Sequence, residues 1–232
     1  MRQLPLGVQL GVTHRFETFH EGANRETLLA LAAQAAEPGG PPLWLYGPPG
    51  SGRSHLLQAA CARAGEQGLT AAWLPLDTAR GGDPAMLAGF ERLGLVALDD
   101  VDAVAGDAGW ERALFTLWNE IAEQRGRLVM AAAAAPAAIP FGLPDLASRL
   151  ASSRVHRLQP LAEHEQAEAL VQRARHRGLE LPPETLHYLT RRAPRDFAAL
   201  CRLLDELDTE SLAAQRRLTV PFVRDWLARV ES

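Results

Sequence analysis

The sequence contains no lysine, so all 24 of its basic residues are arginine. It has only two cysteines, Cys61 and Cys201, and both lie in surroundings rich in alanine and leucine. Two such cysteines exclude a disulfide-stapled scaffold and a cysteine-rich zinc site, and the seven histidines are not spaced as a metal cluster. The exclusive use of arginine indicates a GC-rich coding bias. This bias must be considered when an arginine that occupies a usual lysine position is interpreted.

Long hydrophobic runs and an excess of positive charge are also missing. The run Leu128–Ala138 is too short and too rich in alanine to cross a membrane, and the N-terminus lacks the apolar core of a signal peptide. With 28 acidic residues the formal net charge is −4, which counts against a protein that mainly grips a nucleic-acid backbone. We therefore predict a soluble, cytoplasmic protein without a membrane partner.

Enough apolar residues are present for a substantial core: 47% of the 232 residues are hydrophobic. Short apolar runs alternate with longer helical patterns, which is typical of βαβ units and a parallel sheet. Because these runs are almost wholly apolar, we expect strands covered on both faces. The expected strands are Leu43–Tyr46, Ala71–Leu76, Leu95–Leu98, Leu128–Ala132 and Val155–Leu158.

Helices are expected between these strands and throughout the C-terminal part. The expected helices before Pro160 are Glu26–Ala36, Ser54–Glu66, Pro84–Arg92, Gly109–Gln124 and Leu143–Leu150. The pattern after Pro160 contains no strand, and its helices are Glu163–Arg177, one opening at Pro182–Pro183, Arg195–Leu207 and Pro221–Val230. We predict an α/β fold with a parallel five-stranded sheet in residues 13–160, followed by a small all-helical domain in residues 161–232.

The most specific motif is the phosphate loop, residues Gly47–Ser54, with the sequence GPPGSGRS. It follows an expected strand and opens a helix, which is the context that the motif G-x-x-x-x-G-K-[ST] requires. Gly50 and Gly52 allow backbone N–H groups to converge on phosphates, and the helix N-terminus favours an anion. The hydroxyl of Ser54 can reach Mg²⁺, whereas the alternative is a Gly/Pro-rich turn without a ligand.

Arg53 departs from this motif because it stands at the lysine position. A guanidinium is bulkier than an ammonium group and planar. The substitution can reflect coding drift, or it can mark a site that holds a nucleotide and hydrolyses it poorly. We expect binding to be kept and intrinsic hydrolysis to be weak.

A pair of acids ends the expected strand Leu95–Leu98. Asp99 is predicted to hold Mg²⁺ through water, and Asp100 to polarise the attacking water. Such a pair is a weak signal alone, but it gains weight about one βαβ unit after a phosphate loop. Asp102 is interpreted as a solvated turn residue or a helix cap.

These two motifs and the helical C-terminal part resemble the AAA+ ATPases, and within them the DnaA-type replication initiators. The segment Phe16–Asn24 looks like the adenine-side segment of that family, although a hydrophobic strap with Asn24 as helix cap explains it as well. The resemblance implies that Arg149, in the sequence LASRL, is an arginine finger. It also implies that Arg195 is the sensor 2 arginine of a lid domain. Arg154 is the rival finger, and we interpret it as structural.

The closer resemblance is to DnaA-homologous regulators, which inactivate the initiator after replication has begun. It rests on GRSH (52–55), GLPDLASRL (142–150), LQPL (158–161), RHRGLELP (175–182) and AQRRLTVPFV (214–223). The sequence also ends where an initiator continues into a basic DNA-binding domain. This resemblance implies bound ADP or ATP with Mg²⁺ held by Ser54 and Asp99. The nucleotide-binding residues would be Gly47, Pro48, Pro49, Gly50, Ser51, Gly52, Arg53, Ser54, His55 and Arg195.

The N-terminal segment 1–12 contains QLPLGV (3–8), which resembles the short motif by which replication proteins dock on the β sliding clamp. An extended terminus with spaced apolar residues suits a groove on a partner. The resemblance implies that Gln3, Leu4 and Leu6 bind the clamp and that DNA is reached only through it. The alternative is that this apolar segment packs on its own domain.

The strand Leu128–Ala132 lacks the polar sensor 1 residue that active members of the family carry, because it continues into alanines. This favours a nucleotide-bound regulator that acts on the ATP of the initiator DnaA. Two other readings stay open. One is an autonomous AAA+ ATPase that uses Asp100 and an intersubunit Arg149, which leaves self-assembly open. The other is a DNA-binding initiator paralogue, which the net charge of −4 disfavours.

Overall fold

The computed structural model describes residues 14–192 and 197–230. Its five strands form one parallel sheet in the order β2-β3-β4-β1-β5. The predicted parallel five-stranded sheet is therefore confirmed. The strands are β1 (Leu43–Tyr46), β2 (Ala71–Pro75), β3 (Leu95–Asp99), β4 (Leu128–Ala132) and β5 (Arg154–Arg157).

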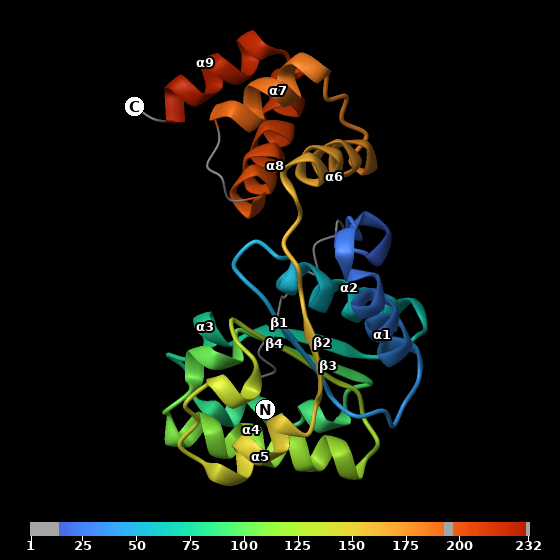
Figure 1. Cartoon of the computed structure of the whole chain (residues 1–232), viewed down its shortest axis with the longest axis vertical. Helices are drawn as coiled ribbons and strands as arrows, with labels where there is room; N and C mark the ends of the chain where they lie inside the picture. The colour runs from blue at the N-terminus through green and yellow to red at the C-terminus, as the bar shows by residue number, and fades with distance from the viewer. Residues whose placement is uncertain (1–13, 193–196, 231–232) are drawn as a thin grey trace. The chain divides into compact units, whose positions relative to one another are not determined.

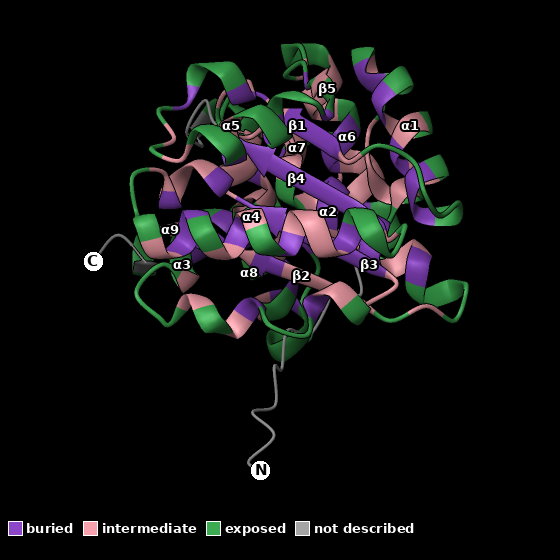
Figure 2. Cartoon of the chain, turned by 90° about the horizontal axis from the view of Figure 1, so that it is seen from below, coloured by how far each residue is buried: buried purple, intermediate pink, exposed green. Residues whose placement is uncertain are grey.

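The three central strands are buried along nearly their whole length, as their apolar sequences predict (Figure 2). The prediction that every strand is covered on both faces is wrong for β5. This edge strand begins at Arg154, one residue earlier than predicted, and Arg154, Val155 and Arg157 are exposed. An edge strand pairs on one side only, and charged side chains are common on such strands.

Helices cover both faces of the sheet (Figure 1). The helices α1 (Arg25–Ala36) and α2 (Arg53–Glu66) pack on one face, where Leu31 and Leu57 belong to a core with strand residues. On the other face, α4 (Ala108–Glu123) and α5 (Pro144–Ala151) close a second core. Because the strands are parallel, the carboxyl ends of β1, β3 and β4 lie at the same edge of the sheet.

Two local predictions are wrong. The strand β2 ends at Pro75, because proline cannot donate to the sheet, and the short helix α3 (Leu76–Ala79) follows. The segment Pro84–Arg92 is not one helix but two short 3-10 helices, Pro84–Leu87 and Phe90–Arg92. Gly89 separates them with φ of 94°, a left-handed conformation that an α-helix cannot contain.

The described residues form two compact units. One takes in the residues up to Gln159 except Pro49–Ser51, and the other takes in Pro160 onward together with those three residues. The second unit is helical: α6 (Glu163–His176), α7 (Pro183–Arg192), α8 (Phe197–Ala214) and α9 (Val220–Val230). The helix α8 continues past the predicted end at Leu207.

Apolar packing and ion pairs hold the helical unit together. Leu170, Leu204 and Trp226 belong to its buried core. Arg173 donates two hydrogen bonds to Asp205, which ties α6 to α8. None of the helices in the described ranges is long and apolar enough to cross a bilayer.

Candidate functional site

The phosphate loop joins β1 to α2, which is the strand–loop–helix context that its sequence predicts. Gly50 and Gly52 have φ of 78° and 92°, in the left-handed region that favours glycine. Gly52 is the residue that precedes the first turn of α2, and as a glycine it offers no side chain to cap that end. The uncapped N–H groups of a helix start are donors for an anion.

Phe19 packs directly against the phosphate loop. A Cβ added to Gly52 would lie 2.5 Å from Cε2 of Phe19, which is too close for any real Cβ atom. The ring of Phe19 also contacts the ring of His55, with 5.4 Å between the centroids. The predicted adenine-side segment therefore lies beside the loop, and Gly52 is required for both its backbone angle and its close contact.

Asn24 anchors the other end of this segment, although not as the predicted helix cap. Its side chain makes no capping hydrogen bond to α1. Instead Nδ2 donates to the carbonyl oxygen of Gln159 at 3.0 Å, and the Gln159 N–H donates to Oδ1 at 2.8 Å. Asn24 is 3% exposed, so this paired contact is protected from water.

Arg53 forms an ion pair with Asp100, the second acid after β3. Its Nη2 donates to Oδ1 of Asp100 at 3.3 Å, and the two side chains are 14% and 32% exposed. The other terminal nitrogen, Nη1, is buried and has no hydrogen-bond partner among the residues that the structure describes. The structure thus brings the phosphate loop and the acid pair together.

Asp99 lies at the end of β3 and is 1% exposed. Burial raises the pKa of its carboxyl above the ordinary value, while hydrogen bonds from Ser54 and Trp73 and the charge of Arg53 act in the opposite direction. The Trp73 indole N–H donates to Oδ2 of Asp99 at 3.3 Å. This contact could not be predicted from the sequence, because only the sheet order shows that β2 neighbours β3.

Asp100 has a left-handed backbone with φ of 48°, which is uncommon for a residue other than glycine. Burial and the neighbouring charge of Asp99 raise the pKa of its carboxyl, and the guanidinium of Arg53 lowers it. A raised pKa favours the neutral acid, so the ion pair with Arg53 is the contact that stabilises the carboxylate.

The end of β4 carries small apolar side chains at Ala131 and Ala132, as the sequence predicts for the sensor 1 position. The backbone N–H of the next residue, Ala133, donates to Oδ1 of Asp102 at 3.3 Å. Asp102 lies in a short 3-10 helix after β3, Val101–Val104, and its side chain also holds the turn after β4, a contact that the sequence does not predict.

Arg149 is exposed on the last turn of α5. Its Cζ lies 4.9 Å from the ring centroid of Trp118 on α4, a cation–π contact that the sequence analysis missed. The rival Arg154 opens β5, and its backbone N–H donates to the carbonyl oxygen of Pro42 at 2.8 Å. Arg195 and the clamp residues Gln3, Leu4 and Leu6 lie outside the described residues.

Glu111 on α4 is a second residue that the sequence analysis missed. It is 1% exposed, and its carboxylate accepts hydrogen bonds from the N–H groups of Gly106, Gly142 and Leu143. Leu143 directly precedes α5. Glu111 therefore fixes the start of the helix that carries Arg149.

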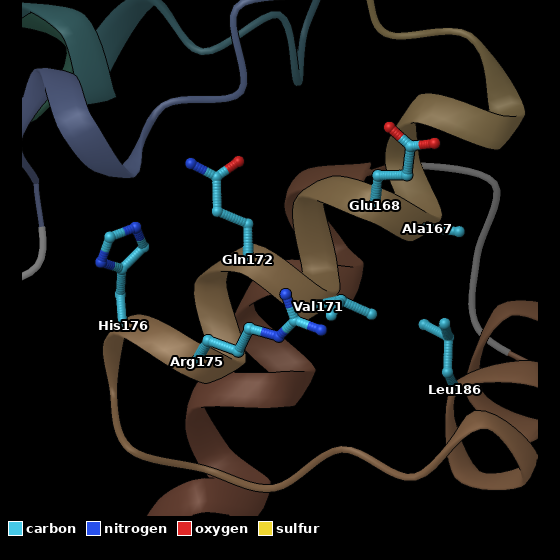
Figure 3. Close-up of a pocket in the computed structure, with 7 residues that line it drawn as sticks. All are labelled: Ala167, Glu168, Val171, Gln172, Arg175, His176 and Leu186. Atoms are coloured by element: carbon cyan, nitrogen blue, oxygen red, sulfur yellow. The ribbon is translucent and has the colours of Figure 1, made fainter.

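The helical unit contains a pocket of about 610 Å³ between α6 and α7 (Figure 3). It is lined by Ala167, Glu168, Val171, Gln172, Arg175, His176 and Leu186. Glu168 and Arg175 introduce charges of both signs, and the lining holds no residue of the phosphate loop or the acid pair. The chemistry of the candidate site therefore lies in the α/β unit, around the phosphate loop.

The residues of this site fit a nucleotide and Mg²⁺. The uncapped helix start and the buried, unpartnered Nη1 of Arg53 are donors for phosphate oxygens. The exposed Ser54 hydroxyl and the Asp99 carboxylate, which are hydrogen-bonded to each other, provide the oxygen atoms that Mg²⁺ prefers.

Comparisons with known proteins agree with this fold. A family model described as the Hda lid domain matches residues 163–227. Domain III of the replication initiation protein DnaA from Thermotoga maritima has a TM-score of 0.75 at 21% identity, covering 91% of this chain and 94% of that chain. AMPPCP-bound DnaA from Aquifex aeolicus has a TM-score of 0.70 at 20% identity, covering 86% of this chain and 66% of that chain.

The branch migration motor RuvB from Thermotoga maritima is also similar, with a TM-score of 0.60 at 15% identity over 88% of this chain and 67% of that chain. Identities at this level establish the fold alone. The chain therefore shares the fold of DnaA domain III, and its residues 163–227 match the Hda lid domain.

Proposed function

We propose that this chain is a nucleotide-bound regulator of replication initiation. It docks on the DNA-loaded β sliding clamp and stimulates hydrolysis of the ATP bound to the initiator DnaA, which prevents re-initiation. The match to the Hda lid domain and the DnaA-like fold support this role. The alternative is an autonomous AAA+ ATPase, which the presence of Ser54, Asp99 and Asp100 in one site favours.

The ion pair between Arg53 and Asp100 is the observation that carries the proposal. Asp100 occupies the position expected to polarise water, but its carboxylate accepts a hydrogen bond from a guanidinium. The end of β4 offers alanines where an active enzyme has a polar side chain. A site of this kind holds a nucleotide better than it hydrolyses one.

Binding is assigned to the phosphate loop, with His55 beside it and Arg195 from the lid domain, residues 161–232. Bound Mg²⁺ would neutralise phosphate charge, and Ser54 and Asp99 would hold it. Gly50 and Gly52 let the backbone approach the phosphates, and the start of α2 supplies N–H donors. The Phe16–Asn24 segment lies beside the loop, where Phe19 can border the bound base or sugar.

Arg149 is the group that acts on the partner. Transfer of a γ-phosphoryl group develops charge on its equatorial oxygens, and an arginine supplied in trans accelerates such reactions by about 10³–10⁵-fold. Arg149 is exposed on α5, so it can reach a neighbouring protein. The ATP site of the initiator would receive this guanidinium only when the two proteins dock.

Clamp docking is assigned to segment 1–12, with Gln3, Leu4 and Leu6 as contacts. A clamp on DNA would raise the local concentration of the regulator near the initiator. Deleting residues 1–8 is expected to remove clamp binding in a pull-down assay and to leave the melting temperature nearly unchanged. Retained clamp affinity in this truncated protein would refute the assignment.

The whole proposal is tested by reconstitution. ATP-bound DnaA is mixed with this protein and with clamp loaded on DNA, and ADP formation is followed while each component is omitted in turn. Stimulation should require both the clamp and residues 1–8. Rapid ATP turnover by the isolated protein, without stimulation of DnaA, would instead establish the autonomous ATPase.

A further inference from the structure

Arg53 is the residue of the site whose two terminal nitrogens have different surroundings. Nη2 donates to Oδ1 of Asp100 at 3.3 Å, whereas Nη1 is buried and finds no hydrogen-bond partner within residues 14–192 and 197–230. The side chain is 14% exposed and belongs to the first residue of α2, next to Gly52. One guanidinium therefore lies between the acid pair and the start of a helix that favours anions.

We propose that Arg53 is a built-in suppressor of hydrolysis: Nη2 holds the carboxylate of Asp100 while Nη1 binds a phosphate oxygen of the nucleotide. This inference rests on the proposed nucleotide site and names how that site is regulated. It explains why arginine replaces lysine at this position. In this arrangement the protein still binds its nucleotide, but Asp100 does not orient the water that would attack the γ-phosphate.

The geometry of guanidinium makes this double role feasible. Arginine carries several N–H donors in a rigid planar fork, so one side chain can serve two acceptors in fixed directions. Lysine carries a single compact charge on a flexible stem. Its ammonium group would bind the phosphate and leave Asp100 without a partner. The identity of the residue thus decides whether Asp100 stays paired when phosphate is bound.

The orphaned nitrogen supports the phosphate contact. A buried donor without an acceptor is unfavourable, and a charged donor more so. An anionic oxygen at Nη1 would satisfy this donor and form a charge-assisted hydrogen bond. An acceptor from the protein already occupies Nη2, so Nη1 is the atom left for the ligand.

The ion pair between Arg53 and Asp100 also explains why ATP hydrolysis would be slow. In hydrolysis, water attacks the γ-phosphorus, the bond to the leaving ADP oxygen breaks, and an acceptor orients the water and takes its proton. Asp100 would be that acceptor. Oδ1 of Asp100 accepts a hydrogen bond from the guanidinium of Arg53 at 3.3 Å, so this oxygen is engaged by Arg53 and not by the attacking water.

The test compares Arg53→Lys, Arg53→Ala, Asp100→Asn and the double variants in two assays. Affinity for a fluorescent ADP analogue is measured by titration. The rate of ATP hydrolysis is measured under single-turnover conditions. Arg63→Lys is the matched control, because Arg63 lies on the same helix and pairs with Glu17 at 2.6 Å instead of Asp100.

We expect Arg53→Lys to bind ADP with affinity within about threefold of the original protein and to hydrolyse ATP at least about tenfold faster. Adding Asp100→Asn should abolish that gain. In a double-mutant cycle of Arg53→Ala and Asp100→Asn, the change in ADP affinity of the double variant should differ from the product of the two single changes by about threefold or more.

Two results overturn the inference and are distinguishable. If Arg53→Lys binds ADP but hydrolyses no faster, and the affinities are additive, Arg53 does not suppress Asp100, while the nucleotide site stands. If neither the original protein nor Arg53→Lys binds ADP, although both melt cooperatively, the proposed nucleotide site itself is wrong.

Discussion

The guanidinium of Arg149 lies over the indole ring of Trp118, with its Cζ atom 4.9 Å from the ring centroid. The two residues come from different helices, α5 and α4, and the guanidinium stays exposed while the ring restricts it. An arginine that must enter the site of another protein benefits from such restriction, because less conformational entropy is lost on docking.

The first prediction concerns Trp118. Replacing it with Leu removes the ring under Arg149, and an exposed cation–π contact is worth about 0.5–1 kcal/mol. We expect stimulation of initiator ATP hydrolysis to fall by about two- to fivefold, measured as ADP formation with the clamp on DNA. Trp118→Phe keeps an aromatic face and should retain most of the stimulation. Equal losses in both variants would show that Trp118 acts through packing alone.

The second prediction concerns Gly52. Gly52→Ala places a Cβ 2.5 Å from Phe19 and strains a residue with φ of 92°, so nucleotide affinity should be lost in titration with labelled ADP. Gly68→Ala is the control, because Gly68 has φ of 77° but no heavy atom within 4 Å of the added Cβ. Unchanged affinity in Gly52→Ala would contradict the assignment of the phosphate loop.

The third prediction uses the acid pair. Because burial raises the pKa of Asp99 in the folded state, the charged carboxylate opposes folding at neutral pH, and stability rises as pH falls through the raised value. Asp99→Asn removes the buried charge. It should therefore raise the melting temperature at neutral pH in Mg²⁺-free buffer, and the gain should shrink as the pH falls through the raised pKa of Asp99.

The same substitution should weaken the Mg²⁺ dependence of nucleotide binding, since an amide is a poorer ligand than a carboxylate. Asp145→Asn, an exposed substitution on α5, is the control and should change neither property. A lower melting temperature for Asp99→Asn at neutral pH would mean that the hydrogen bonds from Ser54 and Trp73 outweigh the cost of burying the charge.

The fourth prediction concerns Glu111, whose carboxylate accepts three backbone N–H groups. Glu111→Ala removes the buried carboxylate that these three N–H groups share, and the free energy of unfolding should fall by about 2–4 kcal/mol in urea titration. Glu123→Ala, an exposed change on the same helix, should cost less than about 0.5 kcal/mol. A loss for Glu111→Ala no greater than that of the control would show that α5 does not depend on it.

The strands and the phosphate loop could be predicted from the sequence because both are local signals. Leu43–Tyr46 is a short apolar run, and Gly50 and Gly52 require backbone angles that few other residues adopt. The position of Arg53 between the phosphate loop and Asp100 could not be predicted. It depends on β1 and β3 ending at the same edge of the sheet, with only β4 between them.

Three side-chain contacts could not be predicted for a similar reason. Asp102, Trp73 and Asn24 each use their side chain on a partner far away in the sequence: Ala133, Asp99 and Gln159. Near each residue, the sequence offered only the common uses of these residue types, namely a turn, core packing and a helix cap. Such partners become visible only when the order of the strands is known.

The central claim is that Arg149 acts in trans on the ATP of the initiator. The direct measurement mixes Arg149→Ala with clamp, DNA and ATP-bound DnaA and follows ADP formation, with Arg154→Ala as the matched control. Arg149→Ala should still bind the clamp and its own nucleotide but lose stimulation by about 10³-fold or to background, whereas Arg154→Ala should stimulate normally. Stimulation that persists in Arg149→Ala and disappears in Arg154→Ala would contradict the claim.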